Sequence, residues 1–484
     1  MGTSVNKERK LIIDIAVCAV WSLFVLVVSN CDLALMNPLQ IAILTAGFIG
    51  LSYLVIRSEG RDKTGRIMAI VTIAAIAVRT AYVLYTGAQQ RQHDMGEFDS
   101  DLGLNYHAEY IEYLLENHKL LDQDITQHWQ FYHPPLQHII CAVFFGIYRK
   151  IVPSLAHNWD ALQWLSLFYS LVTLAVAKRF AGIWKLSKKG TLIAYLTIAF
   201  HPQLIVFSGA LNNDPLSVMF AVAALYLALI WYRDERKSFL KLMGISICVG
   251  LGMMAKLSAG IIAVPIAFIM LKAFFEAKKK GRFVWQYIVF LAVCAPLGLW
   301  YQVRSLVLWN VPVNYVAVPD LELNPGLDIS MIPAWKRFFA FGEGVNYNII
   351  NETLNEAVFD GGYYQPYPLL SAIGYIMFSA YAVLTLTVLM NLIVSWIKER
   401  SMDNLVMTIL IAAELVSYVI FCFKMPYTCT MSFRYIVPTI IAGAYYSGKA
   451  GSNSPRILSA FTTGAAIAFA AVSFIFYCLV WLAD

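Results

Sequence analysis

The chain is dominated by hydrophobic runs, most of them long enough to cross a bilayer as helices, for which about 20 apolar residues are needed. Only 14% of the 484 residues are charged and 59% are hydrophobic, whereas about 25% of the residues in a soluble domain are charged. The chain therefore lacks the polar surface that would cover soluble domains of this size. We expect an all-α, polytopic membrane protein with about 13 transmembrane helices.

Lysine and arginine set the expected orientation, because they concentrate in cytoplasmic loops. They cluster between the hydrophobic runs, so the net charge of +6 does not indicate nucleic acid binding. The clusters are residues 7–10, 57–66, 178–189, 233–237, 272–282 and 398–400. Most of the eight cysteines lie inside apolar runs and form no metal motif. No small-residue cleavage site closes the first run, which favours a retained helix.

The expected spans follow from run length and from this orientation. They are residues 11–29, 38–56, 67–85, 161–180, 191–207, 215–231, two helices within 239–275, then 285–303, 367–397, 405–423, 435–444 and 457–482. The GMMAKLSAG stretch breaks the long run so that its two helices turn near Lys256. Residues 135–151 are apolar but short, and if they crossed the membrane the later basic clusters would face outward. We therefore expect this segment to be re-entrant or interfacial.

This scheme divides the chain into four parts. Residues 1–66 form an N-terminal transmembrane hairpin, and residues 67–303 form a transmembrane module that includes a first outer loop at 87–134. Residues 304–366 form a second outer, extracytoplasmic loop that is rich in proline, tryptophan and tyrosine. Residues 367–484 contain the C-terminal transmembrane helices.

Titratable groups concentrate in residues 89–138. Four acids, Asp94, Glu97, Asp99 and Asp101, lie within eight residues, and the segment holds six of the eight histidines. Residues 104–121 place apolar side chains on one helical stripe with acids off it, as in a helix that lies in the membrane interface. A solvated loop would also be rich in charge. We favour a loop pressed against the bilayer, because hydrophobic runs flank it on both sides.

Polar residues from later runs are expected at the same face as this loop. They are Asn212, Asn213, Asp214, Lys256, Arg304 and Arg434. A charge at the bilayer centre costs on the order of 2.5–3.5 kcal/mol, so such residues often mark function. At the boundary the cost is lower, and the convergence of acids and cations on one face is the stronger signal.

Acids and cations on one face suit glycosyl transfer from a sugar carried on a lipid phosphate. A carboxylate can take the proton from an acceptor hydroxyl, and cations stabilise the phosphate as it leaves. The alternative is a secondary transporter or a flippase for lipid-linked sugars, in which the acids relay protons or bind ions. A transporter should place its ionisable residues near the midplane with exits to both sides, whereas here they gather on one side.

These residues also resemble the GT-C superfamily of polytopic glycosyltransferases, especially the branch of protein O-mannosyltransferases and bacterial aminoarabinose transferases. The resemblance spans roughly residues 94–435. It rests on an acid followed by YHAEYIEYLLENHKL, on Tyr132-His133-Pro134-Pro135-Leu136, on Asn213-Asp214, on Ala255-Lys256 and on Phe433-Arg434-Tyr435. Two features depart from the family: two extra spans within residues 11–56, and acids that are spread out where the family often has an Asp-Glu pair.

The resemblance implies a GT-C-like fold with interfacial helices in the first large outer loop and a catalytic module at residues 67–303. It also implies a polyprenyl-phosphate sugar donor, an active site on the extracytoplasmic or lumenal face, and inversion at the anomeric carbon. We predict a glycosyltransferase of this type, with an Asp as general base.

Asp94, Asp99 and Asp101 are the candidates for the catalytic base. The spacing to Tyr106 favours Asp101, whereas the distance from the preceding helix favours Asp94.

Each of the other candidates has a structural alternative. His133, Lys256, Arg304 and Arg434 are the candidates for binding the donor phosphate, and Tyr132, Asn213 and Asp214 are those for positioning donor or acceptor. His133 could instead cap a turn, and Asp214 could be the N-cap of the helix that begins at Pro215. Lys256 could snorkel to the interface, and Arg304 could be an ordinary helix-end cation.

We predict no certain cofactor. Clustered acids could hold a divalent cation, as in oligosaccharyltransferase-type relatives, but no metal motif is legible and the nearer relatives do not require one. No nucleotide-binding motif is present, which favours a lipid-linked donor over a nucleotide sugar. The expected partners are a polyprenyl-phosphate sugar, an acceptor hydroxyl on a glycan, lipid or protein, and membrane lipid. The expected location is the bacterial cytoplasmic membrane with the site facing outside, or the endoplasmic reticulum membrane with a lumenal site in a eukaryote.

Overall fold

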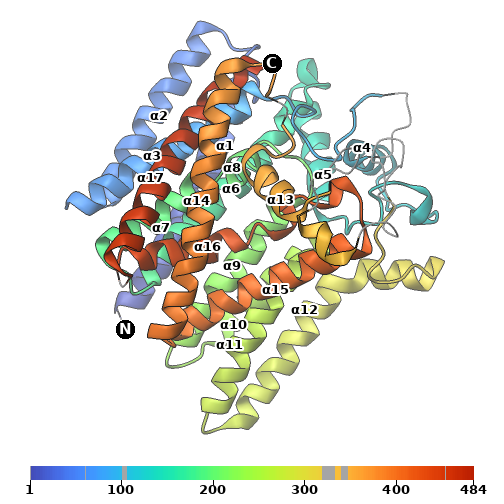
Figure 1. The fold of residues 1–484 in the computed structure, drawn as a ribbon. Helices are drawn as coiled ribbons and strands as arrows, with labels where there is room; N and C mark the ends of the chain where they lie inside the picture. Colours follow the sequence, from blue (N-terminus) through green and yellow to red (C-terminus); the bar gives the residue numbers. More distant parts are fainter. Residues whose placement is uncertain are drawn as a thin grey trace.

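The computed structural model describes residues 2–59, 62–100, 106–318, 333–339, 347–362, 364–452 and 454–483. Every regular element in these ranges is helical. The α-helices are α1 (Gly2–Ser29), α2 (Pro38–Ser58), α3 (Lys63–Tyr85), α4 (His107–Asn117), α5 (Leu136–Ile151), α6 (Gln163–Ile183), α7 (Lys188–Ala199), α8 (Pro202–Val206), α9 (Asp214–Arg233), α10 (Phe239–Ala255), α11 (Ala263–Glu276), α12 (Lys280–Trp309), α13 (Ile349–Phe359), α14 (Pro368–Lys398), α15 (Met402–Lys424), α16 (Thr439–Ala450) and α17 (Arg456–Leu479). Figure 1 shows their arrangement.

Ten helices in the described ranges are long and apolar enough to cross a membrane. Three of the 13 or so spans expected from the sequence form helices that are too short to be counted among these ten. The run 191–207 is divided into α7 and α8 at Pro202, because proline cannot continue the hydrogen-bond ladder of a preceding helix. The other two are α10, with 17 residues, and α16, with 12 residues. The all-α, multi-pass architecture is therefore as predicted, with fewer full-length spans.

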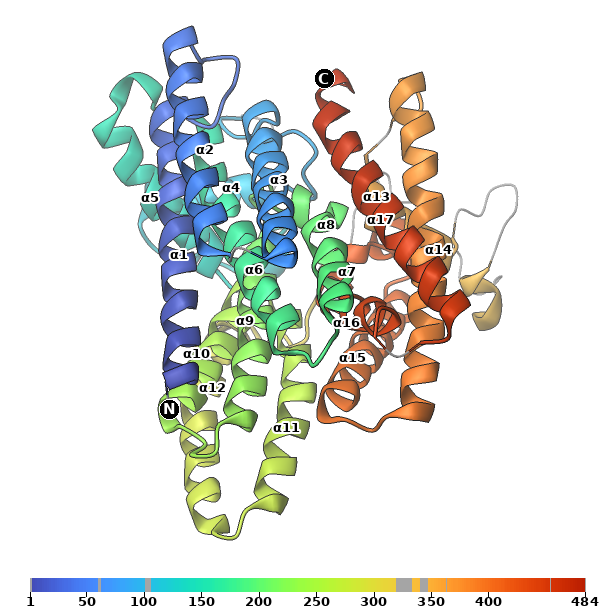
Figure 2. The same ribbon diagram turned by 90° about the vertical axis from the view of Figure 1, so that its left-hand side faces the viewer.

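The N-terminal hairpin and the C-terminal helices lie on opposite sides of the bundle (Figure 2). The hairpin is formed by α1 and α2, and α1 packs along α6. On the other side α14 packs along α17, and α16 packs against α7. Between them, α9 packs closely against both α6 and α10. The extra N-terminal spans therefore add to one side of the bundle and leave its centre to α6, α9 and α10.

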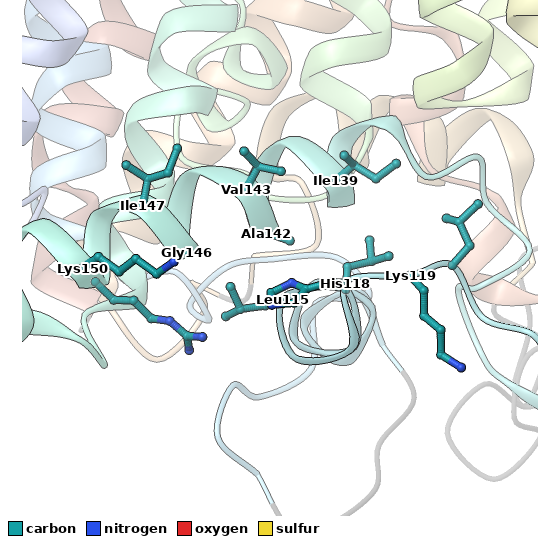
Figure 3. Close-up of a pocket in the computed structure, with 12 residues that line it drawn as sticks. Leu115, His118, Lys119, Ile139, Ala142, Val143, Gly146, Ile147 and Lys150 are labelled. Atoms are coloured by element: carbon teal, nitrogen blue, oxygen red, sulfur yellow. The ribbon is translucent and has the colours of Figure 1, made fainter.

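Two short helices near the first loop have the properties of interfacial elements. The sequence predicted a helix at 104–121, and α4 occupies His107–Asn117 of it, while residues 101–105 lie outside the described ranges. The 16-residue helix α5 is not among the ten candidate spans. Leu115 of α4 faces Ala142 and Gly146 of α5 across a cavity of about 480 Å³, with Lys119 and Lys150 at its two ends (Figure 3). An apolar surface with cations at its ends suits the boundary between lipid and water.

Several of the residues singled out in the sequence lie in segments between helices rather than in the helices themselves. The loop after α3 carries Asp94, and the break between α8 and α9 carries Asn213. The 3₁₀ turn η4 (Leu257–Ile262) follows Lys256, and the 3₁₀ turn η8 (Phe433–Ile436) contains Arg434. Each of these breaks follows or precedes a buried helix, so the bundle holds their side chains in fixed places.

The contact between α7 and α16 depends on glycines. A Cβ on Gly448 would lie 2.8 Å from the carbonyl oxygen of Gly190, and one on Gly451 would lie 2.8 Å from the Gly190 nitrogen. Small residues allow helix backbones to approach this closely, as is common between membrane helices. This contact ties the C-terminal helices to the centre of the bundle.

We expect Gly448→Ala to destabilise the protein by about 1–3 kcal/mol, because the added methyl group meets backbone that cannot move aside. Thermal unfolding in detergent would measure the effect. Gly443→Ala is the matched control on the same helix, since a Cβ there meets no atom within 4 Å. Equal melting temperatures for the two variants would contradict this account of the contact.

Candidate active site

A cavity of about 540 Å³ collects most of the residues that the sequence singled out. Its volume falls within the range typical of small-molecule sites. The predicted residues in its lining are Asp94, Tyr132, His133, Asn213, Lys256 and Arg434. They come from chain segments as far apart as the loop after α3 and the turn before α16. The cavity is therefore a convergence of distant segments, as expected of an active site.

Asp94 and Arg434 form an ion pair at this cavity. The Arg434 Nη2 atom lies 2.8 Å from the Asp94 Oδ2 atom, and 35% of the Asp94 side chain is exposed. Asp94 adopts a left-handed backbone conformation with φ of 54°, which Asp tolerates better than most residues. Removal from water raises the pKa of Asp94, but the Arg434 guanidinium more than offsets this, and the pKa is held well below its usual value. Asp94 is therefore ionised.

Asp214 and Lys256 form a second, more deeply buried pair. The Lys256 Nζ atom lies 2.5 Å from the Asp214 Oδ1 atom, and the two side chains are only 9% and 3% exposed. The same ammonium lies 4.9 Å from the centre of the Tyr435 ring, and the Arg434 guanidinium lies 5.1 Å from it. Tyr435 thus lies against both cations, at distances that favour cation–π attraction.

Two histidines line the cavity as neutral groups. His107 is buried, and its Nδ1 atom lies 2.8 Å from the Nε2 atom of His138. Removal from water lowers the pKa of both His107 and His133. His133 lowers the pKa of His107 further, and Lys256 lowers the pKa of His133 further. His133 can therefore contact a phosphate through a hydrogen bond rather than through a charge.

Two predicted residues that the structure describes, Asp99 and Arg304, make their contacts outside the cavity lining. Asp99 accepts hydrogen bonds from the Trp159 Nε1 atom at 2.8 Å and pairs with His157, and 48% of its side chain is exposed. Arg304 donates to the Leu121 carbonyl oxygen at 2.6 Å and lies 4.7 Å from the Trp309 ring centre, as a helix-end anchor would. Asp101 lies outside the described residues.

Asp214 lies behind the cavity wall, where it contacts Lys256. It is the first residue of α9. Its main role in this structure is as the partner of Lys256 rather than as a group that lines the cavity.

Lys424 is a lining residue that the sequence reasoning missed. It is the last residue of α15, and no ion pair involves it within the residues that the structure describes. The sequence signal was a lysine that closes a hydrophobic run, which is indistinguishable from an ordinary helix-end cation. Among the described lining residues the charged groups are thus one carboxylate, Asp94, and three cations, Lys256, Lys424 and Arg434.

Two amides of the lining have atoms without a hydrogen-bond partner. These atoms are Asn213 Nδ2 and Gln302 Oε1, both buried, and the Nε atom of Arg434 is in the same position. A buried polar atom without a partner is uncommon in folded proteins and calls for an explanation, such as a ligand. The three atoms offer two donors and one acceptor to a polar ligand in the cavity.

The central segment matches a known protein family, and the fold is similar to those of solved membrane proteins. Residues 133–300 match the family described as dolichyl-phosphate-mannose-protein mannosyltransferase. The structure is similar to that of ArnT from Cupriavidus metallidurans in the apo state, with 13% identity, a TM-score of 0.51, and 86% of this chain and 76% of that chain covered. It also resembles the archaeal oligosaccharyltransferase AglB from Archaeoglobus fulgidus, with 13% identity, a TM-score of 0.49, and coverage of 86% and 56%. No curated protein sequence matches significantly.

The fold is therefore that of an integral, multi-pass membrane protein and is similar to the fold of ArnT. The family match over residues 133–300 agrees, in the central part of the chain, with the resemblance inferred from the sequence. Within the matched segment lie His133, Asn213, Asp214 and Lys256, while Asp94 and Arg434 lie on either side of it.

Replacing Asp214 by Asn should destabilise the protein strongly, by about 3–5 kcal/mol, because it leaves the buried Lys256 ammonium without its counter-charge. Chemical or thermal unfolding of the purified protein would measure the loss. The double variant Asp214→Asn with Lys256→Met should recover much of it, because no uncompensated charge then remains. If the double variant were as unstable as the single one, the pairing would not be the cause.

Proposed function

We propose that this protein transfers a sugar from a polyprenyl-phosphate-linked donor to an acceptor hydroxyl on the extracytoplasmic face, with Asp94 as general base. The observation that carries the proposal is the composition of the cavity lining. Asp94 is the one carboxylate among the described lining residues, and it shares the cavity with Lys256, Lys424 and Arg434. A proton acceptor and phosphate-binding cations are the two elements that such a transfer needs.

The reaction is a single displacement. The acceptor oxygen attacks the anomeric carbon while its proton passes to the Asp94 carboxylate. The bond between the anomeric carbon and the phosphate oxygen breaks, and the electron pair leaves with the polyprenyl phosphate. One displacement inverts the anomeric configuration. The cations stabilise the extra negative charge that develops on the phosphate, which is where electrostatic catalysis has its effect.

Two of the three cations in the lining pair with a carboxylate, and the third does not. Arg434 is paired with Asp94, and Lys256 is paired with Asp214. Lys424 has no carboxylate within 4.0 Å among the residues that the structure describes. We therefore assign Lys424 to the donor phosphate, with the unpartnered Nε atom of Arg434 as a second donor to it.

The remaining lining residues suit the other parts of the donor. Asn213 Nδ2 and Gln302 Oε1, which lack partners, are placed to contact sugar hydroxyls. Ile420 and Phe421 of α15 line the cavity, and Ile420 is 49% exposed. This apolar side supports a lipid-linked donor. The matched family is itself described by dolichyl-phosphate-mannose, a sugar on a polyprenyl phosphate.

Asp94→Asn should reduce sugar transfer by a factor on the order of 10²–10⁴, because the amide cannot accept the hydroxyl proton. Release of polyprenyl phosphate from labelled polyprenyl-phosphate sugars by the purified protein would be followed. The amide keeps an oxygen for Arg434, so the variant should still elute as a folded protein.

Asp99→Asn is the matched control, since Asp99 belongs to the same loop but contacts Trp159 and His157 outside the cavity lining. It should transfer sugar at close to the wild-type rate. Activity in the folded Asp94→Asn variant together with loss in Asp99→Asn would assign the base to Asp99 and contradict the proposal.

Lys424→Met should raise KM for the donor by roughly 10- to 100-fold with a smaller change in kcat, since a charge-assisted hydrogen bond to the phosphate contributes about 1.5–3 kcal/mol in ground state and transition state alike. Lys272→Met is the control, because Lys272 pairs with Glu276 in α11 and does not line the cavity. An unchanged donor KM in Lys424→Met would remove Lys424 from the donor site.

A further inference from the structure

A second group of titratable side chains lies next to Asp94 but outside the cavity lining. His93, Glu356 and Asp360 each present one potential metal-binding atom, and these atoms lie within 4.8 Å of one another. The His93 Nε2 atom is 3.0 Å from the Asp360 Oδ1 atom and 3.9 Å from the Glu356 Oε2 atom. The glycosyl transfer proposed above uses none of the three.

The local backbone is built to bring these groups together. Glu356 and Asp360 are four residues apart, so they lie on one face at the end of α13. Asp360 ends the helix in a left-handed conformation with φ of 48°, and Gly361 follows with φ of 73°. A Cβ on Gly361 would lie 3.1 Å from the His93 Cε1 atom. Glycine therefore leaves the space in which the imidazole of His93 meets the two carboxylates.

The group has more acceptors than donors. The exposed fractions of the His93, Glu356 and Asp360 side chains are 24%, 16% and 5%. Gln203 donates from Nε2 to the Asp360 Oδ1 atom at 2.7 Å. The Glu356 Oε2 atom is inaccessible to solvent and has no hydrogen-bond partner among the described residues. Ser432 also hydrogen-bonds to the Glu356 carboxylate, but its Oε2 atom remains without a partner. Two carboxylates thus face one imidazole, and a cation or a proton would satisfy the buried oxygen that lacks a donor.

We propose that His93, Glu356 and Asp360 bind a divalent transition-metal ion of the zinc or manganese type. One imidazole nitrogen and two carboxylate oxygens form a donor set that such ions accept. Gln203 would then orient the Asp360 carboxylate, as hydrogen bonds to metal-binding groups commonly do. The metal would bind the Nε2 atom of the neutral imidazole, which gives up any proton held there.

Such an ion would tie two distant parts of the chain together beside the active site. His93 precedes Asp94 in the loop after α3, whereas the two carboxylates belong to the end of α13. A metal that joins them would fix the position of the loop and so keep the Asp94 carboxylate opposite Arg434. The three ligands are therefore positioning residues and take no part in proton transfer themselves.

Metal content tests the proposal without a transfer assay, so its outcome is independent of the proposed glycosyl transfer. The full-length protein would be purified in detergent, stripped with a chelator, and reloaded separately with ZnCl₂ and with MnCl₂. Bound metal per chain would be measured by elemental mass spectrometry. The shift in melting temperature on reloading would be measured in parallel. We expect about one ion per chain and a higher melting temperature on reloading, because an ion that binds only the folded state stabilises it.

Glu356→Gln, Asp360→Asn and His93→Ala should each abolish stoichiometric binding and the metal-dependent shift. Glu352→Gln should keep both, because Glu352 lies in the same helix but outside the group. Unchanged metal binding in the three ligand variants would overturn the assignment. If these variants did not fold, the wild-type protein would still decide: a folded wild-type chain that neither retains nor rebinds an ion contains only an ordinary ion pair between His93 and Asp360.

Discussion

Charges that are removed from water must be paired, and this constraint organises the centre of the protein. Isolated ions in a low-dielectric interior are too unfavourable to persist, and a close counter-charge offsets much of that loss. Here Asp94 pairs with Arg434 and Asp214 pairs with Lys256, and Tyr435 lies against both cations. The pairs join the loop after α3, the start of α9, the end of α10 and the turn η8. None of these segments can move far without separating opposite charges.

The same constraint explains how the site can remain stable without its substrate and still bind a phosphate. Arg434 and Lys256 are neutralised by Asp94 and Asp214, so the cavity without substrate is not strongly positive. Lys424 at the end of α15 adds one positive charge that no described residue neutralises. A lipid phosphodiester carries a single negative charge, so under the proposed function its binding would complete the charge balance. In the proposed reaction, the second charge on the phosphate would then develop beside Arg434 and Lys256.

Helix positions and the gathering of several polar residues around one cavity could be predicted from the sequence, but side-chain partners could not. Run length and the Lys/Arg pattern located the helices, and the breaks between them led to Asp94, His133, Lys256 and Arg434, which share one cavity in the structure. Asp99 satisfies the same sequence criteria, yet it turns to Trp159, because a loop can point neighbouring side chains in opposite directions. The group around His93 was invisible for a related reason: its carboxylates follow 263 to 267 residues later in the chain, and nothing in the local pattern joins them.

The apolar side of the cavity has a consequence for how the donor enters. Ile420 lines the cavity and is 49% exposed, so under the proposed function a lipid-linked donor would enter the site laterally from the bilayer. A space of about 540 Å³ is suited to a headgroup and the first part of a long chain, and the rest of the chain stays dissolved in the surrounding lipid. Under the proposed function, the protein would then have no means of measuring the length of the lipid chain. It would recognise its donor by the head alone and accept carriers with different numbers of isoprene units.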